Sequence, residues 1–354
     1  MSRLLSPLSL RGTTFRNRIW VSPMCQYSSV DGHPTDWHLV HLGALARGGS
    51  GLVFTEATAV TAEGRISPRD AGIWTDAQAA DYERITAFVR GQGAVPGIQL
   101  GHAGRKASTD VPWRGRGYVE PSDGGWSSVG ASPVGYADWP PPHELDQTAL
   151  ADLVRAWAAA TRRALSAGFE VIEIHAAHGY LLHQFLSPLS NARTDGYGGS
   201  LDSRARLLRE IVDAVRAELP DSAPLFVRVS ASDWVEGGLD VEQVAEVTRD
   251  LAGRGVDLID VSSGGNSPDQ QIAVGPGYQV PFAERIRRES GLPVAAVGLI
   301  TEPAQAEEIV AADRADAVLL ARALLRDPSW PQRAAQELGD DVYWPDQYLR
   351  ARPR

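Results

Sequence analysis

Short apolar runs rich in β-branched residues recur along the chain, and most are followed by a segment with helical hydrophobic spacing. We predict strands at residues 18–22, 51–57, 95–100, 170–175, 225–230, 258–262, 293–298 and 317–322. Helical spacing joins them, for example at 76–92, 148–167, 203–218, 241–253 and 303–312. Asp240 and Gln243, three residues apart, form a start signal for one of these helices. Eight strands alternating with helices predict a parallel sheet, and the count of eight favours a closed (β/α)8 TIM barrel in the α/β class.

The alternative is an open, dinucleotide-binding sheet with a second domain. Fragments of its glycine-rich motif occur at 91–93, 253–255 and 275–277, but none has the third glycine in place after a strand. The 354 residues are enough for two average domains, yet α/β barrels often reach this length as one unit. We therefore expect a single barrel domain spanning residues 1–354.

Three segments fall outside the strand and helix alternation. Residues 1–17 precede the first strand and are expected to form a hairpin that closes the barrel bottom. Residues 105–145 carry six Gly, six Pro and three Trp, and they follow the third strand on the face where barrel active sites lie. This excursion is either a disordered loop or an ordered wall over a pocket, and Trp113, Trp126 and Trp139 favour the wall. Residues 340–354 form a C-terminal tail.

Composition and charge narrow the class of protein. The net charge of −10 disfavours nucleic acid and membrane surfaces as partners. No apolar stretch of about 18 residues is present, and the first residues do not resemble a secretory signal, so we expect a cytoplasmic enzyme. The single cysteine, Cys25, excludes an intrachain disulfide and any all-cysteine metal site. Ten Trp and nine Tyr supply material for an aromatic pocket.

Polar side chains stand at the carboxyl ends of several apolar strands. Side chains alternate faces along a strand, so Gln99, His175 and Arg228 can all point inward at one mouth of the barrel. A single polar strand residue is usually a satisfied core group, whereas three at equivalent positions indicate a ligand. Gly298, Ala321 and Arg322 end the last two predicted strands, where such barrels commonly bind a phosphate.

His175, His178 and Tyr180 follow one another closely at the end of the fourth strand. Two imidazoles at this spacing either bind a metal or donate hydrogen bonds to an oxygen that gains negative charge. The other histidines have no ligand spacing, so we predict no metal site. The pair fits better as donors that polarise a carbonyl, with Tyr180 as a proton donor.

At these residues the sequence resembles the Old Yellow Enzyme family of flavin-dependent ene-reductases, over nearly the whole chain. Within the family it is similar to the thermophilic-like branch, which includes bacterial xenobiotic reductases. The resembling motifs are SPMCQY at 22–27, GIQL at 97–100, HAGRK at 102–106, EIHAAHGYL at 173–181, NARTDGYGGS at 191–200, FVRVS at 226–230 and LRDP at 325–328.

The resemblance implies FMN across the barrel mouth, and it assigns residues to each part of the cofactor. Ser22, Pro23, Met24, Cys25 and Ala57 would lie along the ring system, Gln99 and Arg228 at its pyrimidine edge, and Gly298, Ala321 and Arg322 at the phosphate. Many relatives have Gly-Arg where this chain has Ala321-Arg322, and the backbone N–H survives that change unless φ is positive.

For the substrate, the resemblance implies an oxygen held by His175 and His178, a further contact from Tyr27, and a proton from Tyr180. NAD(P)H, with NADPH expected over NADH, would reduce FMN, which transfers hydride to the β-carbon of an activated alkene such as an enone, enal, maleimide or nitroalkene. Arg350 resembles an arginine that enters a neighbouring subunit's active site, which implies a homo-oligomer, a dimer or tetramer.

Two alternatives remain open beside the ene-reductase. One is another FMN barrel oxidoreductase, such as a 2-hydroxy-acid oxidase or a dihydroorotate dehydrogenase. The other is a flavin-binding sensor that does not turn over an alkene.

Overall fold

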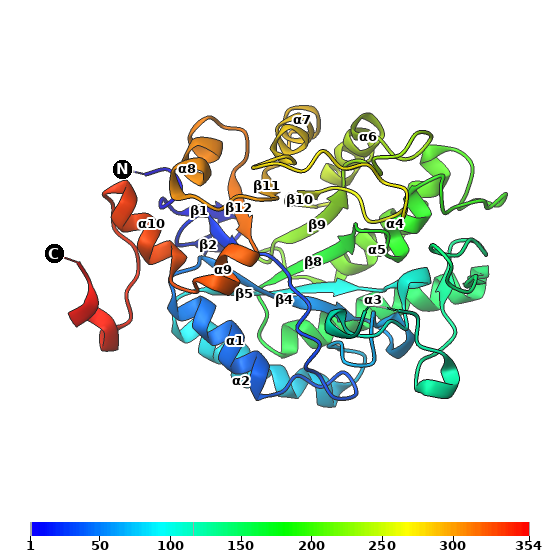
Figure 1. Ribbon diagram of the computed structural model, residues 1–354, viewed down its shortest axis with the longest axis horizontal. Coiled ribbons are helices and arrows are strands. Elements are labelled where there is room, and N and C mark those ends of the chain that lie inside the picture. The colour runs from blue at the N-terminus through cyan, green and yellow to red at the C-terminus, as the bar shows by residue number, and fades with distance from the viewer. Residues whose placement is uncertain (1, 116, 354) are drawn as a thin grey trace.

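The computed structural model describes residues 2–115 and 117–353, so the predicted domain limits Met1 and Arg354 lie outside the described residues. Eight parallel strands close into a barrel, as the alternation of strands and helices predicted (Figure 1). In barrel order they are β3 (Ile19–Val21), β4 (Leu52–Ala59), β5 (Val95–Gly101), β8 (Val171–Ala176), β9 (Leu225–Ser230), β10 (Leu258–Ser262), β11 (Val294–Val297) and β12 (Ala317–Leu320). All eight predicted strands are present, and their bounds differ from the prediction by a few residues.

Helices surround the barrel and follow the strands (Figure 1). The longer ones are α1 (Asp36–Arg47), α2 (Asp76–Gly91), α3 (Gln147–Ser166), α5 (Leu201–Glu218), α6 (Val241–Ala252), α7 (Val280–Ser290), α8 (Pro303–Ala311) and α10 (Trp330–Leu338). Two short helices, α4 (Leu181–Leu186) and α9 (Arg322–Arg326), begin close to strand ends. Asp240 caps α6, since its carboxylate accepts the backbone N–H of Gln243 at 2.9 Å.

Aromatic side chains fill the lower half of the barrel interior. Trp20, Phe54 and Phe226 are fully buried there, and the Trp20 and Phe226 rings stack with centroids 5.7 Å apart. The N-terminal hairpin, β1 (Leu8–Leu10) and β2 (Thr13–Phe15), inserts Phe15 against Trp20 at 4.7 Å. This packing confirms the predicted plug, because Phe15 and Leu10 belong to the same buried cluster as the barrel floor. Polar residues are thereby left to the upper half of the barrel.

The excursion after β5 is built of turns and very short strands. It includes η2 (Gly104–Lys106), η3 (Pro112–Arg114), η4 (Pro121–Asp123), β6 (Val129–Gly130) and β7 (His143–Glu144). The Trp126 indole donates at 2.9 Å to the carbonyl of Glu63, which lies in η1 (Ala62–Gly64) after β4. The Arg65 guanidinium lies 5.0 Å from the Trp126 ring centroid. Side-chain contacts thus tie this long loop to the neighbouring barrel loop.

The C-terminal segment follows α10 and ends in η5 (Asp346–Ala351), which is mostly exposed. Figure 1 shows it on the side of the molecule opposite the excursion. Across residues 2–115 and 117–353, no helix has both the length and the apolar character needed to cross a membrane.

Candidate active site at the barrel mouth

The structure brings the three strand-end residues together on the barrel interior. His175 lies in register with Arg228 on the neighbouring strand β9, and Gln99 lies in register with Glu173 on β8. All three predicted side chains are buried, at 1% exposure for Gln99, 4% for His175 and 6% for Arg228. Arg228 donates from Nη1 to the Ser22 hydroxyl at 3.2 Å, which joins the end of β3 to the same group.

His175, His178 and Tyr180 form one compact cluster. His178 Nδ1 and His175 Nε2 are 3.4 Å apart, and the Tyr180 ring meets the His175 ring edge-on at 5.1 Å. Burial, with Arg228 as the next largest cause, lowers the pKa of both imidazoles well below 6.5. Both rings are therefore neutral near pH 7, and each carries one N–H donor.

The turn that carries His178 is held on every side by hydrogen bonds. His178 has a left-handed φ of +59°, which is uncommon for a residue other than glycine. Its N–H donates to the Ser230 hydroxyl at 2.9 Å, and its carbonyl accepts from the Lys106 ammonium at 2.9 Å. At the next position, a Cβ on Gly179 would lie 2.2 Å from the Gly265 carbonyl oxygen, so only glycine fits there.

The loop after β3 carries the predicted residues Ser22, Pro23, Met24, Cys25 and Tyr27. Its position is fixed by Glu56, whose carboxylate accepts the Gln26 backbone N–H at 2.9 Å and contacts His38 Nε2 at 2.8 Å. Tyr27 adopts a φ of +52°, a strained conformation of a kind that clusters at functional sites. Ala57, also predicted, is the one half-buried residue of the otherwise buried β4.

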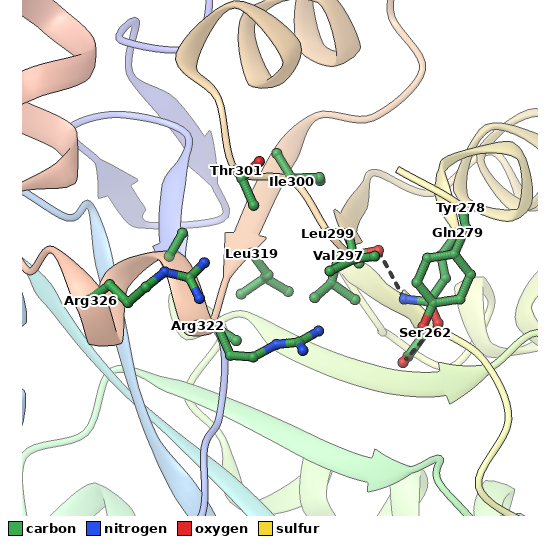
Figure 2. A pocket seen from close by; sticks show the side chains of 13 residues that line it. Ser262, Tyr278, Gln279, Val297, Leu299, Ile300, Thr301, Leu319, Arg322 and Arg326 are labelled. Carbon is green, nitrogen blue, oxygen red and sulfur yellow. Dashed lines mark hydrogen bonds between the residues drawn. The ribbon is translucent and has the colours of Figure 1, made fainter. Parts of the chain in front are cut away.

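A cavity of about 230 Å³ lies where the phosphate site was predicted, between the ends of β11 and β12. Its lining includes Gly298, Ala321 and Arg322 together with Tyr278, Gln279 and Arg326 (Figure 2). Ala321 has a φ of −112°, so this position does not need the positive φ that favours glycine. Within the described chain, the guanidinium groups of Arg322 and Arg326 have no carboxylate partner, which leaves two cations beside the cavity.

A second cavity, of about 200 Å³, lies outside the histidine pair. Tyr27 and Tyr180 line it together with three residues of the excursion, Lys106, Tyr136 and Trp139. The Tyr136 and Trp139 rings pack with centroids 5.3 Å apart, and the Lys106 ammonium lies 4.6 Å from the Tyr136 ring centroid. The excursion thus supplies an aromatic wall next to Tyr180.

The sequence model of the NADH:flavin oxidoreductase / NADH oxidase family matches residues 3–341. The chain belongs to this family, that of the Old Yellow Enzymes. An NADPH dehydrogenase of Geobacillus sp. (strain WCH70) is 48% identical over 349 residues, which cover 98% of both proteins. An NADH:flavin oxidoreductase of Gibberella zeae is 44% identical, covering 96% of this chain and 87% of the relative.

Among solved structures, morphinone reductase superposes on this Old Yellow Enzyme family member with a TM-score of 0.78. The two are 27% identical, and the match covers 98% of this chain and 92% of morphinone reductase. The chain is therefore an NAD(P)H-dependent flavin oxidoreductase, with FMN and NAD(P)H as its cofactors.

The residues present fit FMN. The cavity at Arg322 and Arg326 offers two cations to a phosphate. Gly298, which also lines this cavity, has a φ of +117°, and a Cβ at this position would lie 2.7 Å from Gln279 Nε2. The lack of a side chain at Gly298 therefore leaves its backbone accessible to a ligand. At the mouth, the buried Arg228 guanidinium pairs through Nε with Asp260 at 3.0 Å and donates from Nη1 to Ser22. A cation at that depth suits a flavin ring edge that gains negative charge. In contrast, no group of three metal-ligating side chains is found among the described residues.

Several residues of the site were not identified from the sequence. They are His38, Glu56, Tyr278, Gln279 and Arg326. Glu56 had a signal, because a carboxylate inside the apolar run of β4 is unusual. Tyr278 and Gln279 directly precede α7, and no local pattern marks them. Arg350 lies exposed in η5.

Proposed function

We propose that this flavin oxidoreductase is an ene-reductase, which reduces the C=C bond of an enone, enal, maleimide or nitroalkene with NADPH. The observation that carries the proposal is the pair of neutral imidazoles, His175 and His178, packed against Tyr180 beside an aromatic cavity. Bound FMN supplies the redox chemistry, accepting a hydride from NAD(P)H and delivering it to the β-carbon of the alkene.

His175 and His178 donate hydrogen bonds to the carbonyl or nitro oxygen of the substrate. As the β-carbon accepts hydride, negative charge moves to that oxygen, and fixed donors in a site shielded from water stabilise it. Burial, followed by the charge of Arg228, lowers the pKa of both imidazoles and keeps them neutral. A neutral ring with a defined N–H is the form that suits a hydrogen-bond donor.

Tyr180 holds the proton for the α-carbon. Its ring stands edge-on to His175 and lines the outer cavity, so a substrate that fills this cavity contacts it. Tyr27 lines the cavity as well, as a further substrate contact. The flavin is held by Ser22, Pro23, Met24, Cys25 and Ala57 along its ring, by Gln99 and Arg228 at its pyrimidine edge, and by Gly298, Ala321 and Arg322 at its phosphate.

We propose further that the enzyme is a homo-oligomer in which Arg350 enters the active site of a neighbouring copy. The support is an apolar face next to the site, formed by Trp37, Val40 and Leu325, which are 56%, 70% and 48% exposed. The Trp37 indole donates to the Gln26 side chain at 3.0 Å, one residue from Cys25 and Tyr27. We assign Arg350 to the barrel mouth of the copy that covers this face.

An anaerobic titration tests the activity. NADPH should bleach the yellow protein, and 2-cyclohexenone should restore its colour. His175→Ala combined with His178→Ala should keep FMN and its bleaching but lose most of the recovery, and Tyr180→Phe should slow recovery about 100-fold or more, the usual contribution of a general acid. Bleaching without recovery for any activated alkene would favour the sensor. Recovery at the wild-type rate in the double variant would refute the assigned role of the histidines.

A further inference from the structure

Two acidic side chains lie inside the barrel below the histidines, and the mechanism above does not use them. Glu173 on β8 and Asp260 on β10 are both 0% exposed. Each interrupts an otherwise apolar strand, VIEIHA and LIDVS. Because a fully buried acid is rare unless it is paired, both need a structural reason.

Their partners differ in charge. Asp260 Oδ2 lies 3.0 Å from Arg228 Nε and forms a buried ion pair, and the two residues are in register on neighbouring strands. Glu173 Oε1 accepts a hydrogen bond from the Gln99 amide at 2.8 Å. Asp260 is therefore ion-paired with a cation, whereas the hydrogen-bond partner of Glu173 is a neutral amide.

Arg228, Asp260 and Glu173 carry no net charge as a group when only Asp260 of the two acids is ionised. Burial is the main cause of a raised pKa in both acids. The pKa of Asp260 rises to about 6, and Arg228 opposes this rise. The pKa of Glu173 rises well above its usual value because the nearby Asp260 adds to the effect of burial, while Arg228 and the hydrogen bond from Gln99 oppose it. The ion pair with Arg228 therefore favours the charged form of Asp260, whereas burial favours the protonated form of Glu173. The adjoining His175 is neutral, so Arg228 and Asp260 are the two charges that face each other here.

We propose that Asp260 is a positioning residue that sets the redox potential of the bound FMN by offsetting the charge of Arg228, whereas Glu173 is a neutral partner that orients Gln99. This inference rests on the placement of Gln99 and Arg228 at the flavin in the proposed function. A cation at the ring edge favours the reduced, negatively charged flavin, and a carboxylate 3.0 Å from that cation weakens its effect.

The test compares two isosteric variants, Asp260→Asn and Glu173→Gln, by redox titration of the bound FMN against a reference dye at pH 7.5. Asp260→Asn should raise the midpoint potential, shifting the ratio of reduced to oxidised flavin at least tenfold, or about 30 mV for two electrons. Glu173→Gln should leave that ratio within about twofold of wild type, since glutamine replaces an acid that is already neutral. Asp257→Asn is the matched control, because Asp257 directly precedes β10 and pairs with Arg11 at the opposite end of the barrel.

An unchanged potential in Asp260→Asn would overturn the inference, and so would an equal shift in both variants. If Asp260→Asn does not retain FMN, the wild-type enzyme provides the second measurement. Its reduced-minus-oxidised infrared difference spectrum should show a carboxylate band that shifts on reduction and a protonated acid band that Glu173→Gln removes. Absence of the shifting carboxylate band would also overturn it. The proposed ene-reductase activity fails separately, when wild-type enzyme with a normal potential cannot reduce an alkene.

Discussion

His178 shows how the site is stabilised at the scale of one residue. A left-handed backbone at a non-glycine residue costs on the order of 1–3 kcal/mol, and such strain persists where the surroundings fix it. Here Ser230 accepts the His178 N–H and Lys106 donates to its carbonyl, while Ser262 Oγ lies 2.7 Å from its Nε2. These contacts fix the imidazole beside His175, so the strain serves to orient a hydrogen-bond donor.

The lowered pKa values of His175 and His178 predict a pH-dependent stability. Unfolded histidine takes up a proton below about pH 6.5, whereas these two buried rings resist it, so the unfolded state binds more protons as the pH falls. Their contribution to stability is complete above pH 6.5 and is lost below it, by up to about 1.4 kcal/mol per pH unit for each ring.

Urea denaturation at several pH values between 5 and 7.5 measures this loss. The free energy of unfolding should fall less steeply with acidification in a variant with His175→Asn and His178→Asn than in wild type. The exposed His143→Asn should follow the wild-type curve. Parallel curves for the double variant and wild type would contradict the prediction.

At the scale of elements, strand ends and loops contribute different parts of the site. The strands β5, β8 and β9 fix the depth and direction of Gln99, His175 and Arg228, because residues in register on a closed sheet cannot slide independently. The excursion instead supplies Tyr136 and Trp139 to the outer cavity. We therefore assign the reaction chemistry to the strand ends of the barrel and the selectivity for substrates to the excursion.

Trp139 should select for substrates that carry an aromatic ring. A cavity of about 200 Å³ has room for one ring, since about 150 Å³ accommodates benzene. In Trp139→Ala, the KM for N-phenylmaleimide should rise about tenfold, while the KM for maleimide stays within about twofold, because an aromatic contact is worth roughly 0.5–1.5 kcal/mol beyond buried area. Trp126→Ala, in the same excursion but packed on Arg65, is the control. An equal effect on both substrates would contradict this role.

At the scale of the whole molecule, Trp37, Val40 and Leu325 form an exposed apolar face, which supports the proposed homo-oligomer. Exposed apolar patches beside a functional site commonly mark interfaces. The apolar residues Tyr348 and Leu349, which are 41% and 48% exposed, immediately precede Arg350. A second copy gives both surfaces a partner.

Val40→Asp combined with Leu325→Asp should therefore convert the proposed oligomer to a monomer, because each charge would have to be buried without a partner. Light scattering coupled to size-exclusion chromatography measures the mass. The monomer should keep FMN, since neither residue lines the barrel mouth, and Arg350→Ala should lower activity without changing the mass. A wild-type protein that is already monomeric would refute both the interface and the role of Arg350 in trans.

Most of the fold was predictable because its signals are local. Eight apolar runs with turn residues between them define eight strands, and the capping pair Asp240 and Gln243 marks the start of α6. The buried acids below the histidines were harder to predict. Glu173 and Asp260 were visible as acids within apolar strands, but their partners Gln99 and Arg228 come from other strands. No spacing within one strand shows which charge lies opposite it.

The sequence by itself determined the barrel, its plug and the identity of the side chains at each strand end, since hydrophobic periodicity and alternation of faces depend on neighbours along the chain. Only the tertiary structure decided the distances and the charges. The neutral state of His175 follows from burial near Arg228, and the position of the Tyr27 loop follows from Glu56 on another strand. Burial and electrostatics depend on segments distant in sequence, and closing the barrel brings those segments together.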